Sequence, residues 1–520
     1  MFAWLTGTST TPPIFLAFRS SKGFLVASVS CAVFTDIFLY GIVVPVLPFA
    51  LTTRVGVDPN NVQTWVSILL AVYGAALLAA SPVMGWLADR TESRRMPLLG
   101  GLFALAGSTV LLTVGDSIGI LVAGRVLQGI SAGVVWVVGL ALLVDTVGSS
   151  EIGEVMGYVG MAMSLAVLVA PLLGGVVFDK AGYDAVFAMG YALLGVDIVM
   201  RLVMVEKKIA IRWEKEQGEE GQNNEAEDGE GEAVTDAEVQ RKDMDGVTSV
   251  PRDAESPSAE LKQADAGDLE PADPNAPGAK SWTKRLPPII LLLSSRRLLA
   301  SLWGCLIQAS LLTSFDSTLP IFVRDTFGWD STGAGLIFLP IVVPSFAGPV
   351  VGAISDKYPN GARWLATIGF VAACPILILL RLVSYESIRQ KVLLCALLAL
   401  LGFTLTMVLV PLMAEITYAV EATAKKRPKG FLGDKGAYAQ AYGLFNMAFA
   451  GGCLVGPLVG GLINQHYGWG ATTLTLGCLS IFSAFPTFWW TGSSWRKTMG
   501  GKRNVSANEV ELARPDVDVL

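Results

Sequence analysis

The sequence predicts an all-α membrane protein with 12 transmembrane helices in two pseudo-symmetric six-helix bundles. Hydrophobic residues make up 52% of the 520 residues and charged residues only 16%, whereas a soluble domain carries about 25% charged residues. Apolar runs long enough to cross a bilayer recur along almost the whole chain. An acidic segment separates two sets of six such runs, and the two sets share motifs in the same order.

The first bundle is expected at 24–205, after an N-terminal tail at 1–23. Arg19 and Lys22 precede the first apolar run, which is too long for the apolar core of a cleaved signal peptide. The six runs, in order, lie near 24–51, 63–88, 96–114, 117–145, 153–178 and 185–205.

The second bundle is expected at 286–492, before a C-terminal tail at 493–520. Its six runs, in order, lie near 298–322, 332–354, 363–384, 391–419, 437–463 and 469–491. The segment between the bundles, 206–285, contains stretches such as EKEQGEEGQNNEAEDGEGE. Because this composition cannot bury an apolar core, we expect a disordered acidic linker.

Basic residues predict the orientation in the membrane. They cluster after helices 2, 8 and 10: Arg90, Arg94, Arg95; Lys357, Arg363; and Lys425, Lys426, Arg427, Lys429, Lys435. These three loops share one face of a twelve-helix bundle, and positively charged loops stay in the cytoplasm. Both termini and the acidic linker are therefore expected to be cytoplasmic.

The two halves repeat each other at three places. The end of helix 2, GWLADRTESRR, matches the end of helix 8, GAISDKYPNGAR. Helix 5 contains VAPLLGGVVFDKAGY, which matches VGPLVGGLINQHYGW in helix 11. Helices 1 and 7 share a Leu-Pro pair. Matched landmarks in matching order indicate a six-plus-six duplication. Transporters built in this way bind substrate at the interface of the repeats.

These motifs resemble those of the major facilitator superfamily. Gly85-x-x-x-Asp89-Arg90 with Arg94-Arg95 resembles its signature cytoplasmic loop, Gly124 to Gly129 its Arg-containing helix 4 motif, and Ala170 to Gly175 its antiporter motif. The resemblance implies a transporter that works by alternating access. It implies gating or conformational roles for Gly85, Asp89, Arg90, Arg94, Arg95, Arg125, Asp356, Pro171, Gly174, Gly175, Pro457, Gly460 and Gly461.

Within that superfamily the chain is most similar to vesicular amine transporters and their drug:proton antiporter relatives. The spacing of Asp36 to Pro45 and Pro48 is like theirs, and their helix 1 aspartate contacts the cationic amine. Asp316 falls where they carry a helix 7 glutamate. The sequence departs from them at Tyr73 and Asn446, where they carry a lysine and an aspartate that pair. The resemblance therefore does not specify a monoamine or their particular coupling network.

Three carboxylates within apolar runs are candidate proton or substrate sites, because a charge in hydrocarbon costs several kcal/mol, by rough estimate. Asp36 lies about 18 Å into helix 1, near the bilayer midplane, and Asp316 roughly 27 Å into helix 7. Glu415 lies near the cytoplasmic end of helix 10. The alternatives are a hydrogen bond to a neighbouring helix for Asp36 and a gate contact for Glu415. Asp145 and Asp197 lie near helix ends and are expected to be interfacial.

Polar and aromatic residues within the spans are candidates to line a cavity for a large amphipathic ligand, with plain helix packing as the alternative. They are Tyr40, Tyr73, Gln128, Trp136, Gln308 and Asn446.

The function expected from these observations is proton-coupled antiport of a small organic, cationic or amphipathic compound, with Asp36 alternating between proton and substrate. The alternatives are a facilitator or proton symporter of a nutrient, and a receptor with a transporter fold. No nucleophile–base arrangement, metal-ligand spacing or phosphate-binding loop indicates an enzyme. We expect no cofactor beyond the proton gradient as energy source, no nucleic-acid partner, a monomer, and a plasma, vacuolar or vesicular membrane.

Overall fold

The computed structural model describes residues 15–90, 93–147, 152–207, 293–358, 360–424 and 438–492, together with 210, 211 and 213. The predicted linker beyond residue 213 and the predicted C-terminal tail at 493–520 lie outside the described residues. The regular structure of the described part is helical throughout, and eleven of its helical stretches are long and apolar enough to span a membrane. The last stretch contains two spans, so that the chain has the twelve predicted.

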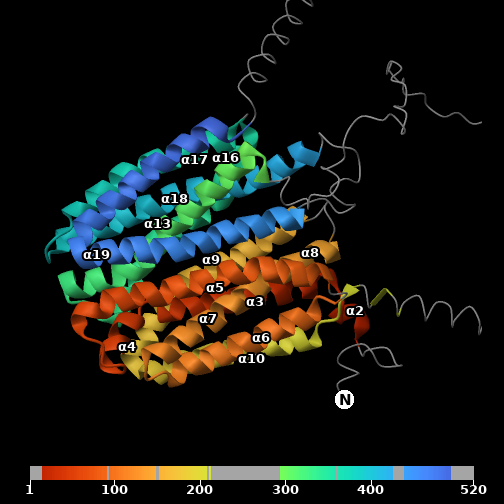
Figure 1. Cartoon of the computed structure of the whole chain (residues 1–520), viewed down its shortest axis with the longest axis horizontal. Helices are drawn as coiled ribbons and strands as arrows, with labels where there is room; N and C mark the ends of the chain where they lie inside the picture. Colours follow the sequence, from red (N-terminus) through yellow and green to blue (C-terminus); the bar gives the residue numbers. More distant parts are fainter. Residues whose placement is uncertain are drawn as a thin grey trace, which may run out of the picture. The chain divides into compact units, whose positions relative to one another are not determined.

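The first half begins with a short helix and continues through six spans (Figure 1, red to yellow). Its elements are α2 (Leu16–Arg19), α3 (Lys22–Val43), α4 (Leu47–Thr53), η1 (Pro59–Asn61), α5 (Val62–Arg90), α6 (Arg95–Val114), α7 (Ile118–Val134), η2 (Val135–Gly139), α8 (Leu140–Val147), α9 (Ile152–Ala181) and α10 (Tyr183–Val203).

The second half supplies the other six spans (Figure 1, green to blue). Its elements are α13 (Arg296–Phe327), α14 (Ser331–Leu336), α15 (Phe338–Val342), η4 (Val343–Ala347), α16 (Gly348–Lys357), α17 (Gly361–Leu379), η5 (Leu380–Leu382), α18 (Ile388–Ala424) and α19 (Tyr438–Trp490).

Proline explains why two predicted single helices are broken. The first span stops at Val43 and resumes at Leu47, around Pro45, with the tight hydrogen bond from Val46 N to the Val43 carbonyl. The eighth span changes from α14 to α15, η4 and α16 along a stretch that contains three prolines. A proline removes a backbone donor and clashes with the preceding turn, so it favours such breaks.

The same backbone turn joins the last two helices of each half. Gly182 between α9 and α10 has φ 83° and ψ −175°, and Gly468 within α19 has φ 76° and ψ 177°. This region of backbone conformation is essentially restricted to glycine. One residue therefore turns helix 5 into helix 6 and helix 11 into helix 12, and the duplication predicted from sequence extends to backbone torsion angles.

The two halves meet mainly through two spans of each half. Helix α5 packs against α19, and α9 packs against α14 and α15; Figure 1 shows α5 running beside α19. We call the end of the bundle where α3 begins and α10 and α19 end the tail end. The opposite end, where α5 begins, is the distal end.

Candidate functional site

A cavity of about 100 Å³ lies between the halves. Its walls come from α3, α5, η2 and α9 of the first half and from α13, α15 and α19 of the second. Most of the lining is aliphatic or aromatic, and Asp316 is the one carboxylate among the described residues that line it. The lining residues with rings are Tyr40, Tyr73, Trp136, Phe338, Phe449 and Pro171.

Tyr40 and Asp316 join the two halves inside this cavity. The Tyr40 hydroxyl donates a hydrogen bond to Asp316 Oδ2 over 3.0 Å. The Tyr40 ring lies 4.7 Å from the Tyr73 ring, centroid to centroid. The structure thus brings together three of the predicted cavity residues, and it places Asp316 rather than Asp36 at the cavity wall.

Arg125 lies behind Tyr40 and is completely buried. Its Nη1 donates to Gln128 Oε1 over 2.8 Å, and its guanidinium carbon lies 5.6 Å from the centre of the Tyr40 ring. Its Nε and Nη2 have no hydrogen-bond partner among the described residues, although Asp316 interacts with it electrostatically. A buried guanidinium needs such compensation, so Arg125 is coupled to the cavity through Tyr40 and Asp316.

Asp36 is completely buried and does not line the cavity. Neither of its carboxylate oxygens has a partner of normal hydrogen-bond geometry among the described residues. The Tyr73 hydroxyl is the neighbouring hydrogen-bonding group, and Arg201 and Asp197 interact with Asp36 electrostatically. Tyr73 also lines the cavity, so it stands between Asp36 and the cavity space.

Arg201 belongs to a buried ion pair on α10. Its Nε donates to Asp197 Oδ1 over 2.9 Å, its Nη2 to Asp197 Oδ2 over 2.7 Å, and its Nη1 to the Leu98 carbonyl over 2.9 Å. Asp197, which was expected to be interfacial, is fully buried within the bundle. The available sequence signal was an acidic and a basic residue four positions apart in an apolar run, which places both on one helix face.

Glu415 lies at the tail end of the second half, away from the cavity lining. It accepts hydrogen bonds from Arg297, whose Nη2 lies 2.9 Å from Glu415 Oε2, and from the Gly492 backbone N over 2.6 Å. These contacts tie α18 to the start of α13 and the end of α19. These contacts lie within the second half, so the gate role of Glu415 stays a prediction.

Two other predicted cavity residues also lie outside the lining. Asn446 Nδ2 donates to Ser81 Oγ over 3.0 Å, which joins α19 to α5 across the halves. Gln308 is buried in α13, and its Oε1 has no partner among the described residues.

The signature loop after helix 2 is described in part. Arg94 Nε pairs with Asp145 Oδ2 at 3.2 Å. The Arg95 backbone N donates to Glu206 Oε1 over 2.8 Å, and Glu206, the first residue of the predicted linker, is buried. The side chains of Asp89 and Arg90 lie outside the described residues. In the matching loop of the second half, Asp356 accepts a hydrogen bond from Tyr418 over 2.9 Å.

The antiporter-type motif of α9 lies against the second half. Ser331 Oγ donates to the Gly175 carbonyl over 3.0 Å. A β-carbon on Gly175 would overlap the Ser331 carbonyl oxygen, and one on Gly335 would overlap the Pro171 carbonyl oxygen. Gly174 packs in the same way on Ile42 of its own half. The glycines therefore let α9 and α14 approach at backbone contact.

The corresponding motif of α19 lies against the first half at the distal end. A β-carbon on Gly461 would overlap Ser67 Oγ, whereas one on Gly460 would meet Ser314 Cβ of its own half at 2.8 Å. Gln63 adds two polar contacts, from its Nε2 to the Ser317 carbonyl over 2.8 Å and from Asn464 Nδ2 to its Oε1 over 2.9 Å. Pro457 lies within the same helix. These contacts hold the halves together at the distal end.

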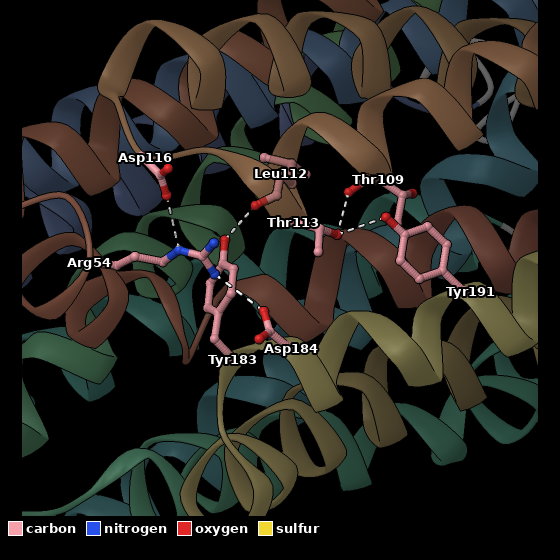
Figure 2. A network of polar contacts seen from close by, with 8 residues as sticks. All are labelled: Arg54, Thr109, Leu112, Thr113, Asp116, Tyr183, Asp184 and Tyr191. Atoms are coloured by element: carbon pink, nitrogen blue, oxygen red, sulfur yellow. Dashed lines mark hydrogen bonds and ion pairs between the residues drawn. The ribbon is translucent and has the colours of Figure 1, made fainter.

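A separate polar network closes the distal end of the first half (Figure 2). Arg54 lies between Asp116 and Asp184, at 3.4 Å from each carboxylate, and its guanidinium carbon lies 4.5 Å from the centre of the Tyr183 ring. The Tyr183 hydroxyl donates to the Leu112 carbonyl over 2.6 Å. The network ties the end of the first span to the third and sixth spans without touching the second half.

Comparison with known proteins identifies the family. The family model described as Major Facilitator Superfamily matches residues 29–431. The uncharacterized MFS-type transporter C18.02 of Schizosaccharomyces pombe is 33% identical over 90% of this chain and 95% of its own length.

Two further likenesses are more distant. A multidrug resistance protein B homolog of Mycobacterium tuberculosis is 33% identical over 25% of this chain and 24% of its own length. The crystal structure of the human organic anion transporter MFSD10 aligns over 90% of this chain and all of its own, with a TM-score of 0.55 and 16% identity. The fold, the family model and the full-length relative agree, and the chain is a multi-pass membrane protein that belongs to the major facilitator superfamily.

Proposed function

We propose that this chain exchanges protons for a small organic, cationic or amphipathic compound by alternating access of the cavity between the halves. The observation that carries the proposal is the position of Asp316. It is the one carboxylate among the described residues that line a mostly apolar cavity, and it accepts a hydrogen bond from Tyr40 across the interface. An ionisable group in such a place is expensive and favours a proton or ion site.

The cavity walls favour a cation with an apolar, ring-containing body. Tyrosine, tryptophan and phenylalanine rings surround Asp316, and aromatic faces attract organic cations. Arg125, the buried cation nearby, is not among the lining residues. An organic anion would therefore meet a carboxylate and no basic group among the described lining residues, which is why we favour a cationic compound.

The proposal divides the roles of the two aspartates. Asp316 contacts the compound, because it lines the cavity. Asp36 acts as a second protonatable group behind Tyr73, because it is buried and has no normal hydrogen-bond partner among the described residues. This division changes the expectation that Asp36 binds both proton and substrate.

The cavity volume supports a cycle in which the halves part. A cavity of about 100 Å³ is smaller than typical ligand pockets, which have about 300–1,000 Å³. The glycine contacts at Gly175 and Gly461 hold the distal end closed. In the proposed cycle the compound enters when the tail end opens, and it leaves when these distal contacts separate. With both termini in the cytoplasm, the cycle moves the compound out of the cytoplasm.

Reconstitution into proteoliposomes tests the proposal. A pH gradient should drive accumulation of cationic compounds from a panel, a protonophore should abolish it, and the D316N variant should lose it. D325N is the matched control, because Asp325 is an exposed aspartate on the same helix, paired with Arg324.

Three other outcomes would contradict the proposed antiport or the proposed role of Asp316. Undiminished gradient-driven transport by D316N would refute the role of Asp316. Accumulation of the compound together with protons would favour a symporter, and equilibration without a gradient response would favour a facilitator.

A further inference from the structure

A large groove lies on the outside of the second half at the tail end. It has a volume of about 1,050 Å³ and is formed where α13 begins and α19 ends. Its lining is Arg296, Leu299, Ala300, Trp303, Phe482, Phe485, Pro486, Trp489 and Trp490. None of these residues lines the cavity between the halves, so the groove is a separate site.

The groove exposes aromatic side chains that a soluble protein would bury. Phe485 is 72% exposed, Phe482 68% and Trp489 62%. In a membrane-spanning bundle such a surface faces lipid. Its position at the ends of two spanning helices places it near the membrane–water boundary, where tryptophan is enriched.

One positive charge at the groove has no counterion among the described residues. Arg296 is exposed, the described lining contains no carboxylate, and Arg296 forms no ion pair with the described residues. The next residue, Arg297, is already paired with Glu415. The charge of one arginine is therefore compensated within the bundle, and that of the other is directed to the groove.

We propose that this groove binds an anionic phospholipid, with the headgroup phosphate on Arg296 and the acyl chains along Trp303, Phe485 and Trp489. Two features together favour this ligand. One is an apolar, aromatic surface open to the bilayer, and the other is the cation of Arg296 at the level of the headgroups, which forms no ion pair with the described residues. Basic pockets between spanning helices bind anionic headgroups in this way. The site does not depend on which compound the cavity transports.

Native mass spectrometry of the detergent-solubilised full chain tests the charge. Phosphatidylglycerol should bind in preference to phosphatidylcholine of the same acyl chains, and R296A should reduce that preference by about fivefold, the effect of one basic residue near an anionic surface. R296K should retain the preference. The matched control is R381A, because Arg381 is an exposed arginine of the same half at the distal end. An equal preference in R296A and R381A would overturn the proposal.

Fluorescence quenching tests the place of the acyl chains. In proteoliposomes, brominated phosphatidylglycerol should quench the protein more than brominated phosphatidylcholine at the same mole fraction. The excess should fall in W489F and in R296A, and it should persist in W364F, a tryptophan exposed on α17. An excess that W489F leaves intact would refute the groove as the site. A second copy of the chain could cover the groove instead of a lipid. A dimer that phosphatidylglycerol does not dissociate, with the groove protected in it, would also refute the proposed lipid site.

Discussion

The Tyr40 hydroxyl reaches across from the first half of the bundle to Asp316 of the second, over 3.0 Å. Both groups line the cavity, and a compound that takes the place of the Tyr40 hydroxyl at Asp316 Oδ2 would compete with this hydrogen bond. In the proposed cycle, binding at Asp316 therefore releases a direct link between the halves.

Replacing Tyr40 by phenylalanine tests that link. Y40F keeps the ring beside Tyr73 and Arg125 and removes the donor to Asp316. Leaving a fully buried acceptor unpaired costs about 1–3 kcal/mol. Asp316 is partly buried, and we expect gradient-driven transport to fall by about tenfold, a factor that corresponds to ~1.4 kcal/mol. Y191F, which removes a hydroxyl contact to Thr113 inside the first half, should leave transport near its original rate. Equal effects of the two substitutions would contradict a special role for Tyr40.

The Asp36→Asn variant separates binding from proton coupling. Because Asp36 does not line the cavity, the variant should still exchange labelled for unlabelled compound across the membrane without a gradient. If Asp36 is a protonatable group of the cycle, accumulation driven by a pH gradient should be lost. Counterflow and gradient-driven uptake in one proteoliposome preparation measure both. Loss of counterflow together with uptake would show that Asp36 acts on binding or folding instead.

The ion pair on α10 predicts a large stability effect. D197N leaves the buried guanidinium of Arg201 without its bidentate partner, and loss of one member of a buried pair costs about 3–5 kcal/mol. A lower thermal unfolding temperature in detergent should follow, and the double variant D197N/R201M should recover part of the loss. D184N removes a carboxylate that is 88% exposed, so its effect should stay below about 1 kcal/mol. Equal unfolding temperatures for D197N and D184N would contradict the prediction.

Replacing Gly461 by alanine should change the conformation of the bundle and not only its stability. A β-carbon there overlaps Ser67 Oγ, so G461A should hold the halves apart at the distal end. Labelling of a cysteine placed at Asn464, which is partly buried against Gln63 of α5, should then become faster. Adding S67G should restore slow labelling, since it removes the overlapping atom. The control G195A adds a β-carbon with no atom within 4 Å, and unchanged labelling in G461A would refute the prediction.

The sequence predicted that Asp36 and Asp316 lie within spanning helices, but it did not predict the direction in which they point. Depth follows from counting residues along a span. Direction requires an amphipathic pattern, and α3 and α13 are apolar around most of their circumference, so no stripe identifies the inner face. For this reason Asp36 was expected at the cavity, and the structure places Asp316 there. The spans themselves were predictable, because hydrocarbon demands long apolar helices.

Side-chain contacts between distant spans could not be read from the sequence at all. The hydrogen bond from Asn446 to Ser81 and the contact of Gly461 with Ser67 depend on how two helices are rotated about their axes. The motifs predicted that helices 5 and 11 matter for closure, because both carry proline and paired glycines. They did not identify the partners, Ser331 and Ser67, which are ordinary polar residues within apolar runs.

The one-residue turns at Gly182 and Gly468 have a mechanical consequence. A longer connection would absorb a displacement of one helix before its neighbour felt it, but a single residue leaves no slack. In the proposed cycle, a shift of the Gly461 segment away from Ser67 should therefore be transmitted to the helix that ends at Trp489 and Trp490, which line the groove proposed to bind lipid. If the proposed cycle and the proposed lipid site both hold, opening at the distal end and lipid binding at the tail end should be coupled through this short connection.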